Sequence, residues 1–121
     1  MRKVLALAES KKCTECGLCR TACPVFNILK SETLSPRGKV MLLKEDVKDE
    51  VFFACTLCKS CTTACPLGLE LDKDFRKHRA KLEKVNKTTK PNRLLIDNVR
   101  KYGNPFGKVE EGKIPKRLFC C

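Results

Sequence analysis

Ten cysteines dominate the chemistry available to this chain of 121 residues, and eight of them fall into two runs with the same spacing. Each run reads C-x₂-C-x₂-C-x₃-C-P. The first run comprises Cys13, Cys16, Cys19, Cys23 and Pro24, and the second, displaced by 42 residues, comprises Cys55, Cys58, Cys61, Cys65 and Pro66. Eight of the twelve positions are identical between the runs, which indicates a duplicated ligand-binding unit.

Thiolates at this spacing are typical [4Fe-4S] ligands, because C-x₂-C-x₂-C lets one tight loop reach three corners of the cube. The fourth cysteine of such a run ligates the other cluster, and the proline after it fixes the direction in which the chain leaves. We therefore predict two neighbouring [4Fe-4S] clusters with crossed ligands, able to relay electrons. The first cluster is assigned Cys13, Cys16, Cys19 and Cys65, and the second is assigned Cys55, Cys58, Cys61 and Cys23.

Structural zinc and disulfides are the alternatives for so many cysteines. Zinc sites draw four ligands from two separated pairs, which fits two runs ending in Cys-Pro badly. Disulfides belong to oxidising compartments, and the apolar run from Val4 to Ala8 is shorter than the core of a signal peptide. No stretch approaches the roughly 20 apolar residues of a membrane span. The sequence therefore predicts a cytoplasmic iron-sulfur protein.

The formal net charge of +12 is strongly basic. Each oxidised cluster with its four thiolates contributes a charge of −2, so two clusters lower the total to about +8. Residues 73 to 101 concentrate this charge, with eleven Lys or Arg against three Asp or Glu. We interpret the stretch first as a solvated face and second as a docking surface for an acidic subunit. Nucleic-acid binding, including by a zinc-bound module, is a remote alternative, because only Phe75 and Tyr102 could stack on bases there.

The elements around the cysteine runs are expected to be helices, since few segments alternate between apolar and polar residues. One helix is expected after the Ser35-Pro36 cap, with Gly38 weakening its start. Another follows Asp72 and Asp74, and a third lies between Pro91 and Gly103. Their apolar positions are, in the same order, Val40, Met41, Leu43 and Val47; Leu71, Phe75, Leu82 and Val85; and Leu94, Leu95, Val99 and Tyr102.

Three remaining features receive simpler interpretations. His78 lies among basic residues and is expected to be solvated surface without a role. The vicinal pair Cys120 and Cys121 could be a redox-active dithiol or an inert chain end, and we favour the inert interpretation because no acid-base partner is apparent. The segment after Gly103 has little periodicity and is predicted to be an extended arm that needs a partner to become ordered.

The sequence resembles the two-cluster iron-sulfur subunits related to heterodisulfide reductase and to the glycolate, lactate and anaerobic glycerol-3-phosphate dehydrogenase systems. The resemblance covers roughly residues 10 to 107, and the Ser-Pro-Arg-Gly element separates this group from ordinary two-cluster ferredoxins. The matching segments are Cys13-Thr-Glu-Cys-Gly-Leu-Cys19, Cys23-Pro-Val-Phe26, Ser35-Pro-Arg-Gly-Lys39, Phe53-Ala-Cys-Thr-Leu-Cys58, Cys65-Pro-Leu-Gly68 and Asn104-Pro-Phe-Gly107.

The resemblance implies an α-helical ferredoxin fold that passes electrons between a flavin-containing subunit and an acceptor. Members often continue into a region with repeated Cys-Cys-Gly signatures that forms the catalytic or quinone-side module. This chain ends at Cys121, so we expect that module on a separate polypeptide or not at all, and no intrinsic disulfide-reductase activity.

Together these observations predict a mainly α protein: an α-helical ferredoxin with two [4Fe-4S] clusters and an extended C-terminal arm. Residues 1–90 are predicted to form the two-cluster domain, and residues 91–121 a helix plus a docking arm. We expect a non-catalytic electron-transfer subunit of a hetero-oligomeric oxidoreductase complex, with a flavin-containing subunit and a Cys-Cys-Gly-type subunit as partners. A free, diffusible two-cluster ferredoxin is the alternative.

Overall fold

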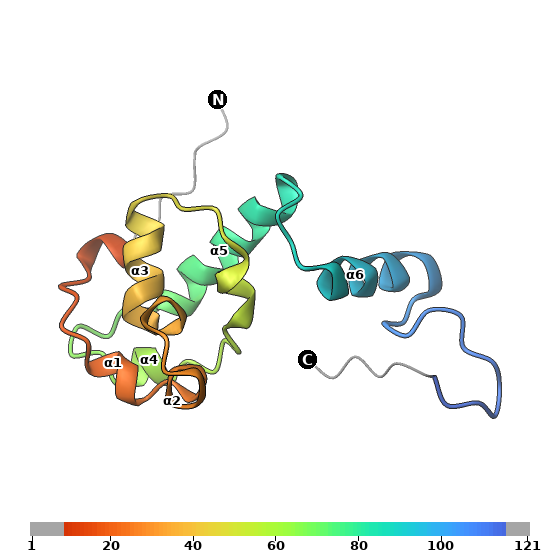
Figure 1. The fold of residues 1–121 in the computed structure, drawn as a ribbon, viewed down its shortest axis with the longest axis horizontal. Helices are drawn as coiled ribbons and strands as arrows, with labels where there is room; N and C mark the ends of the chain where they lie inside the picture. The colour runs from red at the N-terminus through yellow and green to blue at the C-terminus, as the bar shows by residue number, and fades with distance from the viewer. Residues whose placement is uncertain (1–8, 116–121) are drawn as a thin grey trace. The chain divides into compact units, whose positions relative to one another are not determined.

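The computed structural model describes residues 9–115, and these residues form helices, turns and loops without any β-strand (Figure 1). The mainly α fold predicted from the sequence is therefore confirmed. Cys120 and Cys121 lie outside the described residues. The α-helices are α1 (Leu18–Thr21), α2 (Pro24–Leu29), α3 (Pro36–Lys44), α4 (Ser60–Thr63), α5 (Leu71–Lys84) and α6 (Lys90–Tyr102), and the 3₁₀ helices are η1 (Ser10–Lys12), η2 (Glu32–Leu34) and η3 (Glu50–Ala54).

The chain divides into two compact units between Lys87 and Thr88. The first unit contains both cysteine runs, and α6 lies in the second. Within the part of the chain that the structure describes, no helix is long and apolar enough to cross a membrane.

Helix α3 begins where the sequence places its cap. The Ser35 hydroxyl accepts a hydrogen bond from the backbone N–H of Gly38 at 2.9 Å, and Pro36 occupies the first turn, where its missing N–H costs nothing. Gly38 has a role that the sequence did not reveal. A Cβ atom added there would lie 1.9 Å from the backbone oxygen of Glu32, so only glycine lets α3 approach η2 this closely.

The core of the first unit lies between α3, η3 and α5. Its apolar members, all at most 8% exposed, are Val40, Leu43, Phe52, Cys61, Leu69, Leu71, Phe75 and Leu82. Of the eight apolar positions expected for α3 and α5, three are instead solvent-exposed, because α3 ends before Val47, α5 ends before Val85, and Met41 points away from the core.

His78 corrects the expectation of a solvated surface residue. Its side chain is fully buried on α5, and its ring lies 4.2 Å from the ring of Phe52, measured between centroids. Nε2 lies 3.0 Å from the carbonyl oxygen of Val47, so this nitrogen carries the proton and donates it. Burial lowers the pKa of His78, which keeps the ring neutral. The basic neighbours of His78 in the sequence suggested that it is exposed, but they lie on other faces of α5.

Helix α6 runs between the boundaries that the sequence indicated. Pro91 lies in its first turn, and Gly103 ends it in a left-handed conformation with φ of 71°. The Asn98 side chain, within α6, donates a hydrogen bond to the carbonyl oxygen of Pro105 at 2.9 Å and so holds the loop after Gly103 against the helix. The residues from 103 to 115 form turns and extended chain.

Candidate iron-sulfur sites

The two cysteine loops adopt the same backbone conformation. Glu15 and its repeat equivalent Leu57 have φ values of 60° and 56°, and Gly17 and its equivalent Lys59 have φ values of 83° and 65°. Three of these four residues are not glycine, although the left-handed region is unfavourable for residues with a side chain. Each loop then enters a short helix, α1 in the first run and α4 in the second. The repeat seen in the sequence is therefore a structural repeat.

The left-handed residues turn backbone amides toward sulfur. The N–H of Glu15 donates to Cys13 Sγ, and the N–H of Leu57 donates to Cys55 Sγ, both at 3.4 Å. A hydrogen bond from an amide stabilises negative charge on a thiolate. This arrangement suits sulfur atoms that carry the charge of a metal cluster.

Each loop forms one wall of an open cavity, and the last cysteine of the other run forms part of the opposite wall. The first cavity is lined by Cys13, Cys16, Cys19 and Cys65, together with Pro66, Leu67, Leu69 and Leu71. The second cavity is lined by Cys55, Cys58, Cys61 and Cys23, together with Val25, Leu34, Pro36 and Phe75. The structure thus brings together the same two sets of four cysteines that the sequence groups.

The donor chemistry of both cavities fits an iron-sulfur cluster. Each presents four thiols against an apolar backing, and none of these eight cysteines forms a disulfide. A single zinc ion would need four donors about 2 Å from one point. Among residues 9–115, no group of three or more Cys, His, Asp or Glu side chains is arranged to hold one ion. The thiols surround a volume, as a cube requires.

The helices that follow the two cysteine loops, α1 and α4, pack against each other. Cys19 on α1 and Cys61 on α4 are the third cysteines of their loops. Burial, together with the nearby thiols of Cys55 and Cys19, raises the pKa of the Cys61 thiol to about 11. The pKa of Cys19 is raised in the same way, mainly by burial. The packing of α1 against α4 therefore places the two sets of cysteines next to each other.

Cys58 differs from the buried cysteines. Its Sγ lies 3.3 Å from the Ser60 hydroxyl, and hydrogen bonds from the side chain and backbone of Ser60 hold the pKa of Cys58 below its usual value. The repeat equivalent of Ser60 is Leu18, which has no hydroxyl. The first loop therefore lacks this hydrogen bond.

Two basic side chains hold the first carbonyl of each loop from neighbouring helices. Lys44, on α3, donates to the carbonyl oxygen of Cys13 at 3.0 Å and also forms an ion pair with Glu15. Arg79, on α5, donates to the carbonyl oxygens of Cys55 and, at 2.9 Å, of Phe52. Burial lowers the pKa of Arg79, and the Cys55 thiol opposes that effect. Sequence reasoning missed both residues, because their partners are 24 to 31 positions away.

Lys39 is a further residue that the sequence did not single out. It is 1% exposed, lines the second cavity, and donates a hydrogen bond to the carbonyl oxygen of Leu34. Burial lowers the pKa of Lys39, while the thiols of Cys55 and Cys23 act in the opposite direction. The only signal in the sequence was its place in the Ser-Pro-Arg-Gly-Lys segment.

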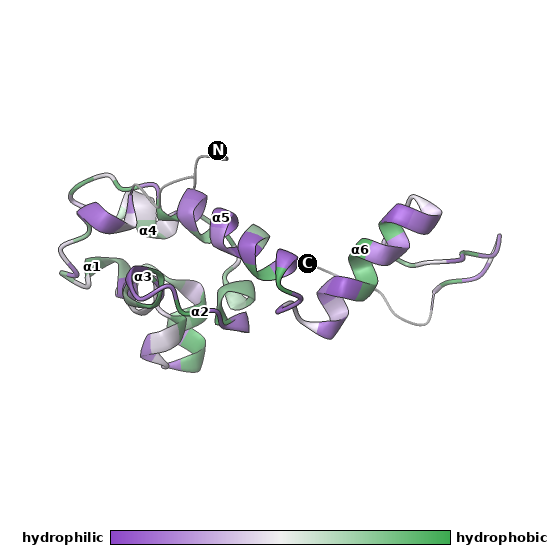
Figure 2. Cartoon of the chain, turned by 90° about the horizontal axis from the view of Figure 1, so that it is seen from above, coloured by the Kyte–Doolittle hydropathy of each residue, from purple (hydrophilic) through white to green (hydrophobic). Residues whose placement is uncertain are grey.

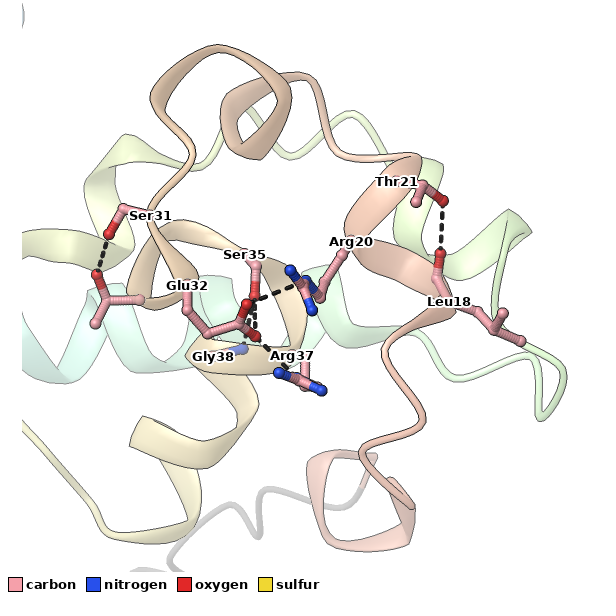
Figure 3. A network of polar contacts seen from close by, with 9 residues as sticks. Leu18, Arg20, Thr21, Ser31, Glu32, Ser35, Arg37 and Gly38 are labelled. Atoms are coloured by element: carbon pink, nitrogen blue, oxygen red, sulfur yellow. Dashed lines mark hydrogen bonds and ion pairs between the residues drawn. The ribbon is translucent and has the colours of Figure 1, made fainter.

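Glu32 links the first cysteine loop to α3 through a network of polar contacts (Figure 3). Its carboxylate accepts hydrogen bonds from Arg37 Nε at 2.8 Å and from the Ser35 hydroxyl at 3.0 Å. Arg20 Nε lies 3.1 Å from the second oxygen as an ion pair, although its N–H does not point along a hydrogen bond. Burial alone would raise the pKa of Glu32, but the bonds from Arg37 and Ser35 outweigh it and lower the pKa.

The fold and the two thiol-lined cavities define an iron-sulfur protein. The sequence profile of the 4Fe-4S dicluster domain matches residues 9–69, which is half of the chain, and the chain belongs to this family. It binds two [4Fe-4S] clusters and functions in electron transfer. Comparison with curated proteins gives no significant match.

Proposed function

We propose that the chain is the electron-relay subunit of a larger complex, in which it passes electrons between a flavin-containing oxidoreductase subunit and an acceptor subunit. A [4Fe-4S] cluster, when bound, accepts and releases one electron at a time. The observation that carries the proposal is the packing of α1, which carries Cys19, against α4, which carries Cys61, because adjacent clusters can transfer an electron directly.

The proposal includes the crossed ligand sets. Cys13, Cys16 and Cys19 are completed by Cys65, and Cys55, Cys58 and Cys61 are completed by Cys23. Supporting this assignment, the prolines after Cys23 and Cys65 direct the chain out of its own loop, and each of these cysteines lines the cavity of the other loop.

The crossing is tested with Cys65→Ser and its repeat-equivalent control Cys23→Ser. Each variant is reconstituted anaerobically, and its clusters are followed by electron paramagnetic resonance and Mössbauer spectroscopy. Cys65→Ser is expected to perturb the same cluster as Cys16→Ser. Cys23→Ser is expected to perturb the same cluster as Cys58→Ser. The opposite pairing would refute the crossed assignment while leaving two clusters in place.

We further propose that residues 1–90 are the two-cluster domain and that residues 91–121 dock onto a partner. Helix α6 supports this, since it has no buried residue in the described structure and alternates hydrophilic with hydrophobic positions (Figure 2). Its apolar residues Leu94, Val99 and Tyr102 are each at least 42% exposed. Arg100 and Lys101 lie in its last turn. An apolar stripe flanked by basic side chains suits an acidic partner surface with an apolar centre.

The docking proposal is tested by anaerobic co-purification from native extract. The full chain is compared with a double variant, Val99→Asp with Tyr102→Asp, and with a control, Lys90→Gln with Arg93→Gln, that removes charge but keeps the apolar stripe. We expect a flavoprotein to co-purify with the full chain but not with the double variant. We also expect salt to weaken the association between the flavoprotein and the full chain. Recovery of the full chain only as a free monomer would instead favour the diffusible ferredoxin.

The kinship with the heterodisulfide reductase and 2-hydroxy-acid or glycerol-3-phosphate dehydrogenase subunits is part of this proposal. It is supported by the Ser35–Lys39 segment, which caps α3, permits its close approach to η2, and presents Arg37 and Lys39 to the two cavities. A Cys-Cys-Gly-type subunit is the expected acceptor. The cytoplasmic location stays a prediction.

A further inference from the structure

We propose that the side chains around the second cavity stabilise added negative charge more strongly than those around the first, so that a single electron shared by the two clusters rests at the second. The residues responsible are Lys39, Arg79 and Ser60. This inference rests on the two-cluster relay proposed above, and it does not depend on which fourth cysteine completes each set.

The second cavity has an excess of positive charge that no carboxylate neutralises by an ion pair. Lys39 lines it and is fully buried, and its hydrogen bond goes to a neutral carbonyl oxygen. Arg79 is half-buried beside Cys55, and its hydrogen bonds also go to carbonyl oxygens. Asp72 lines the same cavity and offsets one of these charges, and exposed Lys59 adds a solvated one. Charges removed from water act more strongly than exposed ones.

The first cavity has basic side chains too, but each is paired with a carboxylate. Arg37 lines it and donates to Glu32 at 2.8 Å. Lys44 holds the carbonyl oxygen of Cys13 and forms an ion pair with Glu15, which itself lines the cavity. Glu32 is shared with Arg20, whose Nε lies 3.1 Å from its second carboxylate oxygen, so these five side chains carry one net positive charge. All five are at least 30% exposed, so water screens that charge more than it screens the buried Lys39.

Hydrogen bonding to sulfur adds to the same difference. The bond from the backbone N–H to the first cysteine of the loop is the same in both, at 3.4 Å. In the second loop the Ser60 hydroxyl lies 3.3 Å from Sγ of the middle cysteine, Cys58, whereas its repeat equivalent in the first loop, Leu18, has no hydroxyl. Once that sulfur is a thiolate, the hydroxyl must donate, which favours the more negative reduced state.

The consequence is a direction for the internal step. With both clusters bound, a single electron would pass from the cluster held by the first loop to the cluster held by the second. Lys39, Arg79 and Ser60 are thus positioning residues that bias the step. The subunit that supplies electrons would then face the first cavity, and the acceptor would face the second.

The test is a redox titration of the reconstituted full chain, followed by electron paramagnetic resonance. Cys16→Ser and Cys58→Ser assign each signal to a loop through cysteines that lie within it. In the unmodified protein, the signal of the Cys55–Cys61 loop should appear at the higher potential. Lys39→Met should reduce the equilibrium constant for its reduction about tenfold, equivalent to about 59 mV for one electron.

Two controls distinguish a local charge effect from general damage. Lys84→Met removes an exposed charge at the end of α5 and should shift neither potential. Ser60→Ala should lower only the potential of the second loop's cluster, and it keeps the inference testable if Lys39→Met does not fold. A higher potential for the first loop's cluster in the unmodified protein, or an unchanged second potential in Ser60→Ala, would overturn the inference. If the crossed ligand assignment proved wrong, the expected order of the two potentials would be the same, because each signal is assigned through a cysteine within its own loop.

Discussion

Replacing Gly38 by alanine sets two effects of known sign against each other. In an exposed helix this change stabilises by about 1 kcal/mol, because alanine loses less backbone entropy than glycine. Here the new Cβ would lie 1.9 Å from the carbonyl oxygen of Glu32, whereas ordinary contacts begin at 3.4 Å. The backbone of α3 or η2 must therefore move by about 1.5 Å, and overpacking of this kind typically costs about 1–3 kcal/mol. Since neither contacting atom belongs to a flexible side chain, we expect the upper end and a net loss of about 2 kcal/mol.

The assay is anaerobic urea unfolding of the cluster-loaded chain, followed by helical circular dichroism and by cluster absorbance. Gly103→Ala is the matched control, since Gly103 has φ of +71° and no atom within 4 Å of an added Cβ. That change should cost about 1 kcal/mol through backbone strain alone. Gly38→Ala should also disturb cluster retention, because α3 presents Arg37 and Lys39 to the cavities. Unchanged or increased stability in Gly38→Ala would show that helix propensity prevails and that α3 does not approach η2 so closely.

Three further predictions concern the cap, the buried histidine and the thiols. Ser35→Ala should lower the free energy of unfolding by about 1 kcal/mol in urea, because the N–H of Gly38 loses its acceptor. Because burial lowers the pKa of His78 below 6.5, the unfolded state binds its proton first, so stability is complete above about pH 6.5 and declines as the pH falls below it. His78→Phe should flatten that decline in urea midpoints measured from pH 7.5 to 5.5, and an equally steep decline would contradict the argument. In the cluster-free chain, iodoacetamide should modify Cys58 faster than Cys61 by mass spectrometry, since the pKa of Cys58 is lowered and that of Cys61 is raised to about 11.

The grouping of three cysteines in each loop could be predicted from the sequence because its geometry is local. Three thiols within seven residues must share one loop, and a proline after the fourth directs it elsewhere. The Ser35 cap and the boundaries of α6 were predictable for the same reason, since caps and prolines act within one turn.

What the sequence could not reveal depends on contacts between distant segments. Lys39 looks like an ordinary helix-surface lysine, and only the packing of α3 against the second loop buries it. The charged neighbours of His78 suggested exposure, whereas the helix turns that one side chain toward Phe52. Gly38 was read as a weak helix start, because the sequence contains no sign of η2 crossing beside it.

Duplication of the cysteine run did not duplicate its surroundings. The loops share their left-handed residues and their N–H···S bonds, so these features cannot make one site different from the other. The carbonyl of the first cysteine is held by Lys44 of α3 in one loop and by Arg79 of α5 in the other, and the two residues are 35 positions apart where the repeat is 42. Within the loops, Ser60 and Lys59 of the second run and Glu15 of the first have no counterpart in the other. The other differences between the two sites originate in the helices outside the repeat, which supply Lys39, Lys44 and Arg79. Substitutions on α3 and α5, which leave every ligand in place, are the changes that should alter the direction of electron transfer.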